Sequence, residues 1–411
     1  MRLCFLSVSA EMGGSEVSLL ELLRGLGRLA PAWTLDLVVP REGTLALRAR
    51  DAGAAVHVLP LPERLARLGE GGRSGSAAAL AERGTSMLLA AGGAGLYSRR
   101  LRRLLETLRP DVVHTNGFKM HVLGARAAPR GTPVVWHLHE YVGARPISRA
   151  LLRRYVPRCA AIVANSRSVE ADVGAALEPL VPVTTIYNAV DANVFRPEGP
   201  AIDLDTLSSL PPAPAGTVRV GLVATFGRWK GHETFLQALQ ALNGEAPVRG
   251  YIIGDALYDT AGSQYTRADF ERRIAALGMS GRVGLTGFID EPARAMRALD
   301  VLVHASTQPE PFGLVIAEGM SSGCAVIVSA AGGAEELVTN GVDAITHVPG
   351  DVQGLSRCIA LLANDAPLRR RLGDTARATA RRRFDPVSFT HGFINVYEAC
   401  RDRPLAHAAR R

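Results

Sequence analysis

The stretch LCFLSVSAEMGGSEVSLLELLRGL, residues 3–26, decides the fold. A short apolar run is followed by a glycine-containing loop and then by apolar residues at helical spacing. The stretch VGLVATFGRWKGHETFLQALQAL, residues 220–242, repeats this order. Each stretch predicts a strand, a loop and a helix, which together form the first unit of a Rossmann-type domain. The sequence therefore predicts two such domains.

Short apolar segments alternate with helical patterns through both halves of the chain, which predicts an α/β fold with parallel sheets covered by helices. The segments are DVVHTNG, PVVWHLHE, AAIVANS and VTTIYN, then GYIIGD, RVGLTGF, DVLVHAS, CAVIVSA and DAITHV. Glycine and alanine clusters dilute the pattern after residue 61, and a helix becomes plain at SRRLRRLLETLRP, residues 98–110. We place an N-terminal domain at 1–194, a proline-rich linker at 195–216, a C-terminal domain at 217–385 and a helix with a tail at 386–411.

The composition limits the class of protein. The 411 residues are 47% hydrophobic, which suffices for two cores. No apolar run reaches the roughly 20 residues of a membrane span, and the N-terminus is interpreted as a strand and loop instead of a signal peptide, so we expect a cytoplasmic protein. Five cysteines without paired spacing predict reduced, buried thiols and argue against a metal site. The formal net charge of +8 is compatible with nucleic acid, anionic lipid or a phosphorylated substrate.

Two carboxylates, Glu310 and Glu318, lie eight residues apart in HASTQPEPFGLVIAEGMSS. A helix that begins near Gly313 would separate them by roughly 12 Å, whereas the acid and base of a glycosidase lie about 5 to 10 Å apart. We therefore expect them to bind opposite ends of one ligand. The N–H groups of the first helical turn lie between them and favour an anion such as a diphosphate. Arg228 and Lys230, in GRWKG, supply positive charge at the carboxyl end of a predicted strand.

The combination of these motifs resembles the retaining glycosyltransferases of family 4, the glycosyl transferases group 1. The motifs are PEPFGLVIAEGMSSGCAVIVSAAGGAEELV, GRWKG, the diglycine of SAEMGGSE, DVVHTNG, HLHE, VANS and YNAVDANVFRP, in the order of that family, so the resemblance spans residues 1 to about 400. It implies the GT-B fold, in which two Rossmann-like domains face each other across a deep cleft and the final helix crosses back to the N-terminal domain. One departure is that only Trp229 separates Arg228 from Lys230, where many relatives have several residues.

The resemblance also implies site residues. The implied catalytic residues are Glu310, His139, Arg228 and Lys230. The implied donor-binding residues are Gly13, Gly14, Arg228, Lys230, Gly287, Phe288, Ile289, Glu310, Phe312, Gly313, Leu314 and Glu318, with Glu318 at the ribose. Acceptor binding is assigned to Ser15, Asn116 and Glu140. Structural alternatives remain open, because the two N-terminal glycines could turn the chain with positive φ, and His137 and His139 could be core residues.

The implied reaction moves a sugar from a UDP- or GDP-sugar to a hydroxyl acceptor in glycan biosynthesis, with retention of configuration and without a metal or other cofactor. The alternatives are a sugar-nucleotide epimerase or hydrolase, and a nucleotide-sugar-binding protein without catalysis. Nucleic-acid binding is disfavoured, because the basic clusters contain few aromatic residues. The clusters SRRLRRLLETLRP and ISRALLRRYVPR are either solvated helix faces or a surface for the inner face of an anionic membrane that carries a lipid-linked acceptor.

Overall fold

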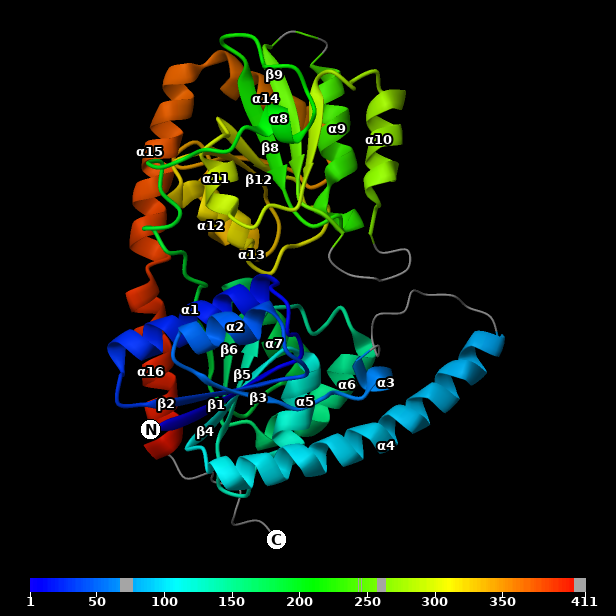
Figure 1. Cartoon of the computed structure of the whole chain (residues 1–411), viewed down its shortest axis with the longest axis vertical. Helices are drawn as coiled ribbons and strands as arrows, with labels where there is room; N and C mark the ends of the chain where they lie inside the picture. The colour runs from blue at the N-terminus through cyan, green and yellow to red at the C-terminus, as the bar shows by residue number, and fades with distance from the viewer. Residues whose placement is uncertain (67–76, 243, 245, 257–263, 403–411) are drawn as a thin grey trace. The chain divides into compact units, whose positions relative to one another are not determined.

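The computed structural model describes residues 1–66, 77–242, 244, 246–256 and 264–402. The chain divides into two compact units (Figure 1). The first unit comprises Met1–Ala189 and Pro386–Arg411, and the second comprises Val190–Asp385. Each unit is an α/β domain, which confirms the predicted fold class.

In the first unit, the described residues form one parallel sheet of seven strands in the order β3-β2-β1-β4-β5-β6-β7. The strands are β1 (Arg2–Ser7), β2 (Thr34–Val39), β3 (Ala55–Val58), β4 (Val112–Asn116), β5 (Val134–Leu138), β6 (Ala161–Ala164) and β7 (Val183–Thr185). The order reverses between β1 and β4, where Ser7 is in register with Asn116. Ligands of such sheets bind at the carboxyl ends of the strands at this switch point.

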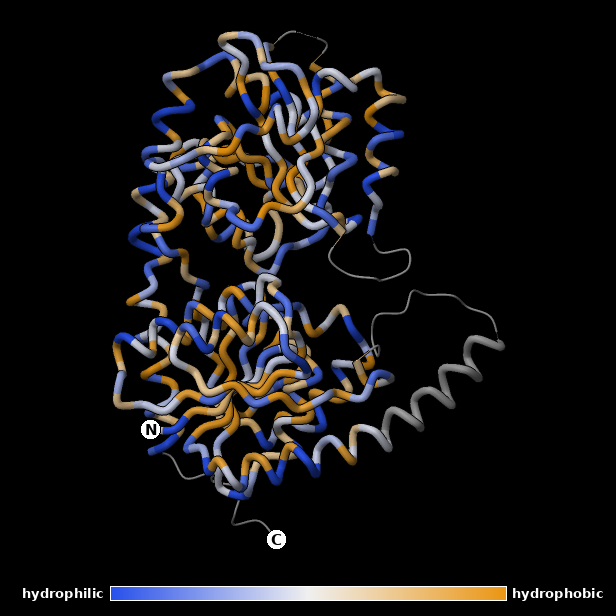
Figure 2. Tube along the Cα trace, in the orientation of Figure 1, coloured by the Kyte–Doolittle hydropathy of each residue, from blue (hydrophilic) through white to orange (hydrophobic). Residues whose placement is uncertain are grey.

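Helices cover both faces of the first sheet, so its five inner strands are almost entirely buried and mostly apolar (Figure 2), whereas the edge strands β3 and β7 are partly exposed. One core includes residues of α4 (Ala77–Leu108), α5 (Phe118–Ala127), α6 (Pro146–Tyr155) and α7 (Arg167–Leu177). The core on the other face includes residues of α1 (Gly14–Leu29), α2 (Thr44–Asp51) and α16 (Pro386–Asp402). The short helix α3 (Glu63–Ala66) contacts α4.

The final helix α16 packs in the first unit, as the resemblance implied. Phe389, Phe393 and Tyr397 are buried in the core that α16 shares with α1. The Tyr397 hydroxyl lies 2.8 Å from Nδ1 of His114 in β4. This aromatic face fixes the helix on the sheet of the first unit.

Helix α4 begins earlier than the sequence pattern indicated. It runs from Ala77 to Leu108, although apolar periodicity is plain only from residue 98. Alanine has the highest helix propensity, so an alanine-rich run can continue a helix without a periodic apolar face. Residues 67–76, which belong to the same diluted stretch, lie outside the described residues.

In the second unit, six parallel strands within the described residues follow the order β10-β9-β8-β11-β12-β13. They are β8 (Val218–Val223), β9 (Val248–Ile253), β10 (Val283–Gly287), β11 (Val301–His304), β12 (Ala325–Ser329) and β13 (Ile345–His347). Residues of α9 (His232–Ala241), α10 (Arg267–Ala276) and α14 (Val352–Asn364) form the core on one face. Figure 1 shows α11 (Pro292–Met296), α12 (Leu314–Ser321) and α15 (Ala366–Arg383) on the opposite side from α9 and α10. The switch point lies between β8 and β11.

The segment interpreted as a linker, residues 195–216, packs against the second unit through α8 (Leu204–Leu207). Asp205 is buried and accepts hydrogen bonds from Tyr251 at 2.6 Å and Arg249 at 2.7 Å. Burial opposes ionisation, but the Tyr251 hydroxyl and the Arg249 guanidinium hold the pKa of Asp205 below its usual range. Because this contact is polar, apolar periodicity did not indicate it.

Two further expectations concern membrane spans and thiols. None of the described helices combines the length and the apolar character of a bilayer-spanning segment. Four of the five cysteines are buried free thiols, as expected, and Cys358 is partly exposed.

Candidate functional site

Two loops at the carboxyl edge of the second sheet form the candidate site. One follows β8 and contains the 3₁₀ helix η2 (Arg228–Lys230), and the other, residues 305–313, follows the neighbouring strand β11. The Thr307 amide donates to the Trp229 carbonyl at 2.8 Å, and the Thr307 hydroxyl donates to the same oxygen at 3.2 Å. The two loops are therefore joined at the switch point.

Glycine is required where each loop meets its helix. Gly231 has φ +77°, and a Cβ there would lie 1.8 Å from the Ala305 carbonyl oxygen. Gly313, with φ +90°, precedes α12. Both glycines are N-caps without a side-chain hydrogen bond, so the first-turn N–H groups of α9 and α12 are left for a ligand or solvent.

Lys230 and Glu310 form a partly buried ion pair between these loops. The ammonium donates to Oε1 of Glu310 at 3.1 Å and to Oε2 at 2.9 Å. The Ser306 hydroxyl donates to Oε2 at 2.9 Å, and Nε2 of His304 lies 3.3 Å from the same oxygen. Burial opposes ionisation, but the Lys230 ammonium and the His304 ring hold the pKa of Glu310 well below its usual value. Glu310 is therefore ionised at neutral pH.

Sequence reasoning missed Ser306 and His304 as partners of Glu310. Both belong to HAS, which joins the end of β11 to the loop of Glu310. Polar residues directly after a buried strand, beside the switch point, were the available signal. Their hydrogen bonds fix the orientation of the Glu310 carboxylate.

Arg228 and Lys230 point to different aromatic partners. The Arg228 guanidinium carbon lies 4.4 Å from the centroid of the Tyr265 ring, and the Lys230 ammonium lies 3.9 Å from that of Trp229. Cation–π contacts of this kind favour a fixed position of the cation. Lys230 is joined to Glu310, whereas Arg228 is exposed and stacks on Tyr265.

Glu318 lies in the second turn of α12, where the sequence placed it, and is partly exposed. Among the described residues, no hydrogen-bond donor or cation pairs with its carboxyl group. Burial raises the pKa of Glu318 to about 7. The two predicted carboxylates therefore differ: Glu310 is paired and ionised, and Glu318 has no partner in the part of the chain that the structure describes.

The remaining donor residues predicted in the second unit lie on the same edge of the sheet. The Gly287 carbonyl, at the end of β10, accepts from the Gly254 amide at 3.0 Å. The Phe288 side chain is exposed and Ile289 is partly buried. Phe312 is instead a core residue, with its ring 5.8 Å from that of Phe384, and Leu314 begins α12.

In the first unit, polar side chains end three neighbouring strands. Asn116 ends β4 and donates to the Ser15 carbonyl at 3.3 Å, His139 follows β5, and Asn165 follows β6. Oδ1 of Asn116, Nε2 of His139 and Oδ1 of Asn165 are buried without a partner among the described residues. Because buried polar groups are nearly always hydrogen-bonded, these atoms mark a place where water or a ligand completes the site. Sequence reasoning missed Asn165, although it lies in the VANS motif.

The other predicted residues of the first unit have ordinary contacts. Gly13 is the N-cap of α1 with φ −122°, so the turn with positive φ does not apply to it, and Gly14 begins the helix. The ring of His137 lies 4.0 Å from that of His139. Burial lowers the pKa of both, that of His139 to about 3, so both rings are neutral. Glu140 is exposed and pairs with Arg145 at 2.5 Å.

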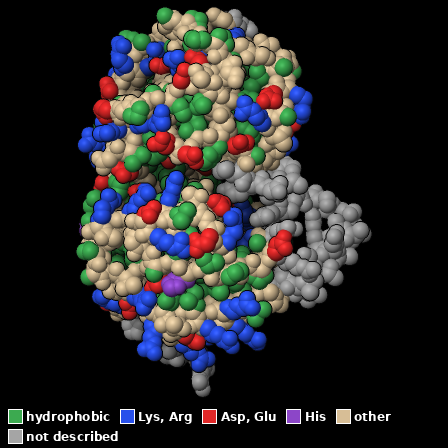
Figure 3. Space-filling model, in the orientation of Figure 1, with side chains coloured by type: hydrophobic (Ala, Val, Ile, Leu, Met, Phe, Trp, Pro, Cys, Tyr) green, Lys and Arg blue, Asp and Glu red, His purple; other side chains and the backbone are tan. Residues whose placement is uncertain are grey.

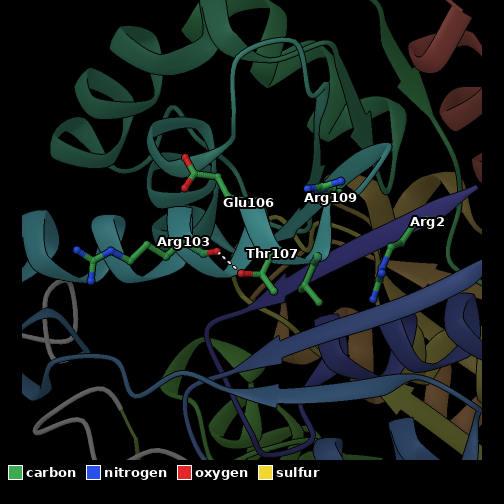
Figure 4. A pocket seen from close by; sticks show the side chains of 6 residues that line it. Arg2, Arg103, Glu106, Thr107 and Arg109 are labelled. Atoms are coloured by element: carbon green, nitrogen blue, oxygen red, sulfur yellow. Dashed lines mark hydrogen bonds between the residues drawn. The ribbon is translucent and has the colours of Figure 1, made fainter.

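A surface pocket of about 720 Å³ lies away from these residues, at the amino ends of β1 and β4 (Figure 4). Its lining residues are Arg2, Arg103, Glu106, Thr107, Leu108 and Arg109. The Arg2 guanidinium is already paired with Asp36 at 2.7 Å. No predicted site residue lines it. In the described part of the chain, no cluster of three or more His, Cys, Asp or Glu is arranged to bind a metal.

Comparison with known proteins shows that a family model matches each half of the chain. The family model Glycosyltransferase Family 4 matches residues 12–194, and the model Glycosyl transferases group 1 matches residues 211–379. The chain is 32% identical over 324 residues to a D-inositol 3-phosphate glycosyltransferase of Xylanimonas cellulosilytica, with 72% of this chain and 73% of that protein covered. It is 28% identical over 178 residues to a lipopolysaccharide core biosynthesis glycosyltransferase, LpsE, of Rhizobium meliloti, which covers 43% of this chain and about half, 49%, of that relative.

Solved structures share the whole fold. Anabaena Alr3699/HepE, solved with UDP and glucose, is 25% identical with a TM-score of 0.75, covering 97% of this chain and 100% of that chain. The sucrose-phosphate synthase of Thermosynechococcus elongatus has a TM-score of 0.76 at 19% identity, with 97% and 98% covered. The second likeness shows the fold alone.

Proposed function

Because the chain belongs to the group 1 glycosyltransferases of family 4, we propose that it transfers a sugar from a nucleoside-diphosphate sugar to a hydroxyl acceptor. The observation that carries this proposal is the Lys230–Glu310 pair beside the uncapped N-terminus of α12, at the switch point of the second sheet. It combines a cation and free N–H groups for phosphate with a carboxylate for hydroxyl groups.

The donor lies along the carboxyl edge of the second sheet. Its diphosphate contacts Lys230, Arg228 and the N-terminus of α12. Glu318 accepts hydrogen bonds from the ribose hydroxyls, for which its unpaired carboxyl group is suited. The backbone of residues 287–289 contacts the base, and UDP is supported as the nucleotide by the HepE structures with UDP and with UDP-glucose.

The transferred sugar contacts Glu310 and the backbone of Phe312, Gly313 and Leu314. Negative charge develops on the leaving diphosphate when the glycosidic bond breaks, and preorganised cations stabilise it by several kcal/mol, of the order seen for other oxyanions. Lys230 is already positioned by Glu310 and Trp229 before the donor binds. The reaction retains the anomeric configuration, with attack on the face that the diphosphate leaves, and needs no metal.

The acceptor binds the first unit. Ser15, Asn116 and Glu140 contact its hydroxyl groups, and His139 contacts the sugar, with Gly13 and Gly14 close to the diphosphate. The unpartnered Oδ1 of Asn116 and Nε2 of His139 support this assignment, because neutral acceptors of hydrogen bonds suit hydroxyl ligands. The cytoplasmic location remains a prediction.

Thermal unfolding with nucleotides, followed by mass spectrometry of products, tests the proposal. UDP or GDP should raise the unfolding temperature of the full chain, and a matching sugar nucleotide should yield a glycosylated product with a suitable acceptor mixture. Glu318→Ala should abolish most of the nucleotide effect. Asp374→Ala, at an exposed position of α15, is the matched control and should leave it unchanged.

Two outcomes contradict the proposal. An equal nucleotide shift in Glu318→Ala and wild type would remove the assigned ribose contact. Release of free sugar or of an epimerised sugar nucleotide, without any glycosylated acceptor, would identify a hydrolase or epimerase with the same donor site.

A further inference from the structure

Helix α6, in the first unit, exposes an apolar pair that its own fold does not bury. Ile147 is 65% exposed and Leu151 is 47% exposed, one helical turn apart. Leu152 is the buried residue of the helix and joins the core beneath the sheet together with Val156. Single exposed apolar residues are normal, but two on one helical stripe form a ridge.

The ridge is surrounded by arginine. Residues 145–158 contain five arginines and no acidic residue. Arg154 follows Ile147 and Leu151 on the same stripe, at positions i, i+4 and i+7, and Arg149 is exposed on the other side of the helix. Arg153 pairs with Glu178 at 2.8 Å, close to Leu180, which is 93% exposed. An apolar ridge flanked by arginine is typical of helices that lie in a lipid interface.

The excess of basic residues is concentrated in the first unit. Residues 1–189 contain 24 Lys and Arg against 15 Asp and Glu, whereas residues 190–385 contain 19 against 22. Basic side chains accordingly spread over the first unit on the face drawn in Figure 3. The second unit, to which we assign the soluble donor, has no such excess.

We propose that α6 docks on an anionic lipid surface, with Ile147 and Leu151 entering the headgroup region and Arg154, on the same stripe, contacting lipid phosphates. A second copy of the chain fits this face poorly, because a symmetric contact would bring arginines together. The docking does not depend on the proposed transferase activity. It would bring a lipid-linked acceptor to the first unit, because α6 begins seven residues after His139, on the loop that leaves β5 at the acceptor edge.

Sedimentation of the full chain with vesicles tests this proposal. The chain should bind vesicles of phosphatidylcholine with phosphatidylglycerol at about 0.1 M salt, and not vesicles of phosphatidylcholine alone, and the binding should weaken strongly at about 0.5 M salt. Ile147→Asp with Leu151→Asp should weaken binding by about tenfold or more. Leu47→Asp is the matched control, since Leu47 is 61% exposed on α2, on the opposite face of the same sheet.

A charge reversal separates docking by α6 from general electrostatic attraction. Arg154→Glu, on the stripe of the ridge, should weaken binding by about tenfold or more, and Arg149→Glu, on the opposite side of the same helix, by less than about threefold. Equal losses in both variants, or no binding by wild type, would overturn the proposal. So would a change from dimer to monomer in Ile147→Asp with Leu151→Asp, because the ridge would then be a protein interface. The nucleotide-induced thermal shift should persist in all these variants, which keeps a failure of docking distinct from a failure of donor binding.

Discussion

The two switch points have the same strand order and opposite chemistry. Around β8 and β11, charged groups meet, with Lys230 paired to Glu310 and Arg228 nearby. At the ends of β4, β5 and β6, the groups are neutral, and Asn116 and His139 each have a buried atom without a partner in the described structure. The difference supports the proposed division of ligands, in which loops on one repeated scaffold give a phosphate-bearing ligand to the second unit and a hydroxyl-bearing one to the first.

The N-terminal caps of the helices affect stability and differ along the chain. The helices that follow the switch-point strands, α1, α5, α9 and α12, begin at glycine without a side-chain cap. Among the helices that follow other strands, α7, α10 and α14 are capped by Ser166, Thr266 and Asp351, whereas α2 and α13 (Gly333–Glu336) also begin at glycine without a side-chain cap. A side-chain cap contributes about 1 kcal/mol. The four switch-point helices lack that stabilisation, and their first-turn N–H groups are not engaged by a side-chain cap.

The largest effect should come from breaking the charged pair. Lys230→Ala should lower sugar transfer by about 10²- to 10³-fold, because it removes the preorganised cation. It should also destabilise the second unit by about 3 kcal/mol, because the ionised carboxylate of the buried Glu310 loses its ammonium partner and keeps Ser306 and His304 beside it. Steady-state rates and urea unfolding measure the two effects.

A double variant separates these two effects. Lys230→Met combined with Glu310→Gln should recover most of the stability, since no buried charge is left unpaired, but none of the activity. Wild-type turnover in the double variant would show that the pair is structural only.

Gly231→Ala should have the next largest effect. The residue has φ +77°, and its Cβ would meet the Ala305 carbonyl at 1.8 Å, so the loop of Lys230 must move. We expect a loss of at least about 2 kcal/mol of unfolding free energy, together with weaker nucleotide binding. Gly278→Ala is the matched control, because Gly278 has φ +67° with nothing within 4 Å of its Cβ position. Similar losses in both variants would show that backbone strain, and not the contact between the loops, sets the effect.

Glu318 should make nucleotide binding depend on pH. Its pKa is raised to about 7 by burial, and ribose hydroxyls donate to the ionised form. Below pH 7 the carboxyl group must lose a proton before it accepts, so the nucleotide should bind up to about tenfold more weakly at pH 6 than at pH 8. Calorimetric titration measures this change. Glu318→Gln should bind more weakly at pH 8 and lose the part of the pH dependence that wild type shows beyond the titration of the nucleotide itself. An unchanged profile in Glu318→Gln would assign that dependence elsewhere.

The strands along the chain, the two glycine loops and the helix of Glu318 could be predicted from the sequence, because apolar runs, glycine and helical spacing are local signals. The pairing of Lys230 with Glu310 could not. The two residues are 80 positions apart, and they meet only because β8 and β11 are neighbours at the reversal of strand order. Periodicity specifies a strand but not its neighbour.

Side-chain contacts between distant polar residues could not be predicted from the sequence, for a related reason. Asp205 attaches the proline-rich segment to Arg249 and Tyr251, and no apolar pattern accompanies it. The position of Arg228 over Tyr265 likewise depends on a side chain from a distant segment. Such contacts are decided by tertiary structure, so sequence reasoning placed these residues in the right loops but could not assign their partners.

The smallest predicted effect concerns His137, which lies in β5 near the end of that strand in the first unit. His137 is buried, both its ring nitrogens lack partners in the described structure, and burial lowers its pKa well below the usual value. Below about pH 6.5 the unfolded chain takes up a proton at this residue and the folded chain does not. The free energy of unfolding therefore decreases as the pH is lowered, by up to roughly 1.4 kcal/mol per pH unit for this group. His137→Phe removes that term and should reduce the drop in unfolding temperature between pH 7.5 and pH 5. The drop should not vanish, because the pKa values of His114 and His232 are also lowered by burial. His391→Phe, at an exposed position of α16, should leave the profile unchanged, and an equal change in both variants would refute the assignment to His137.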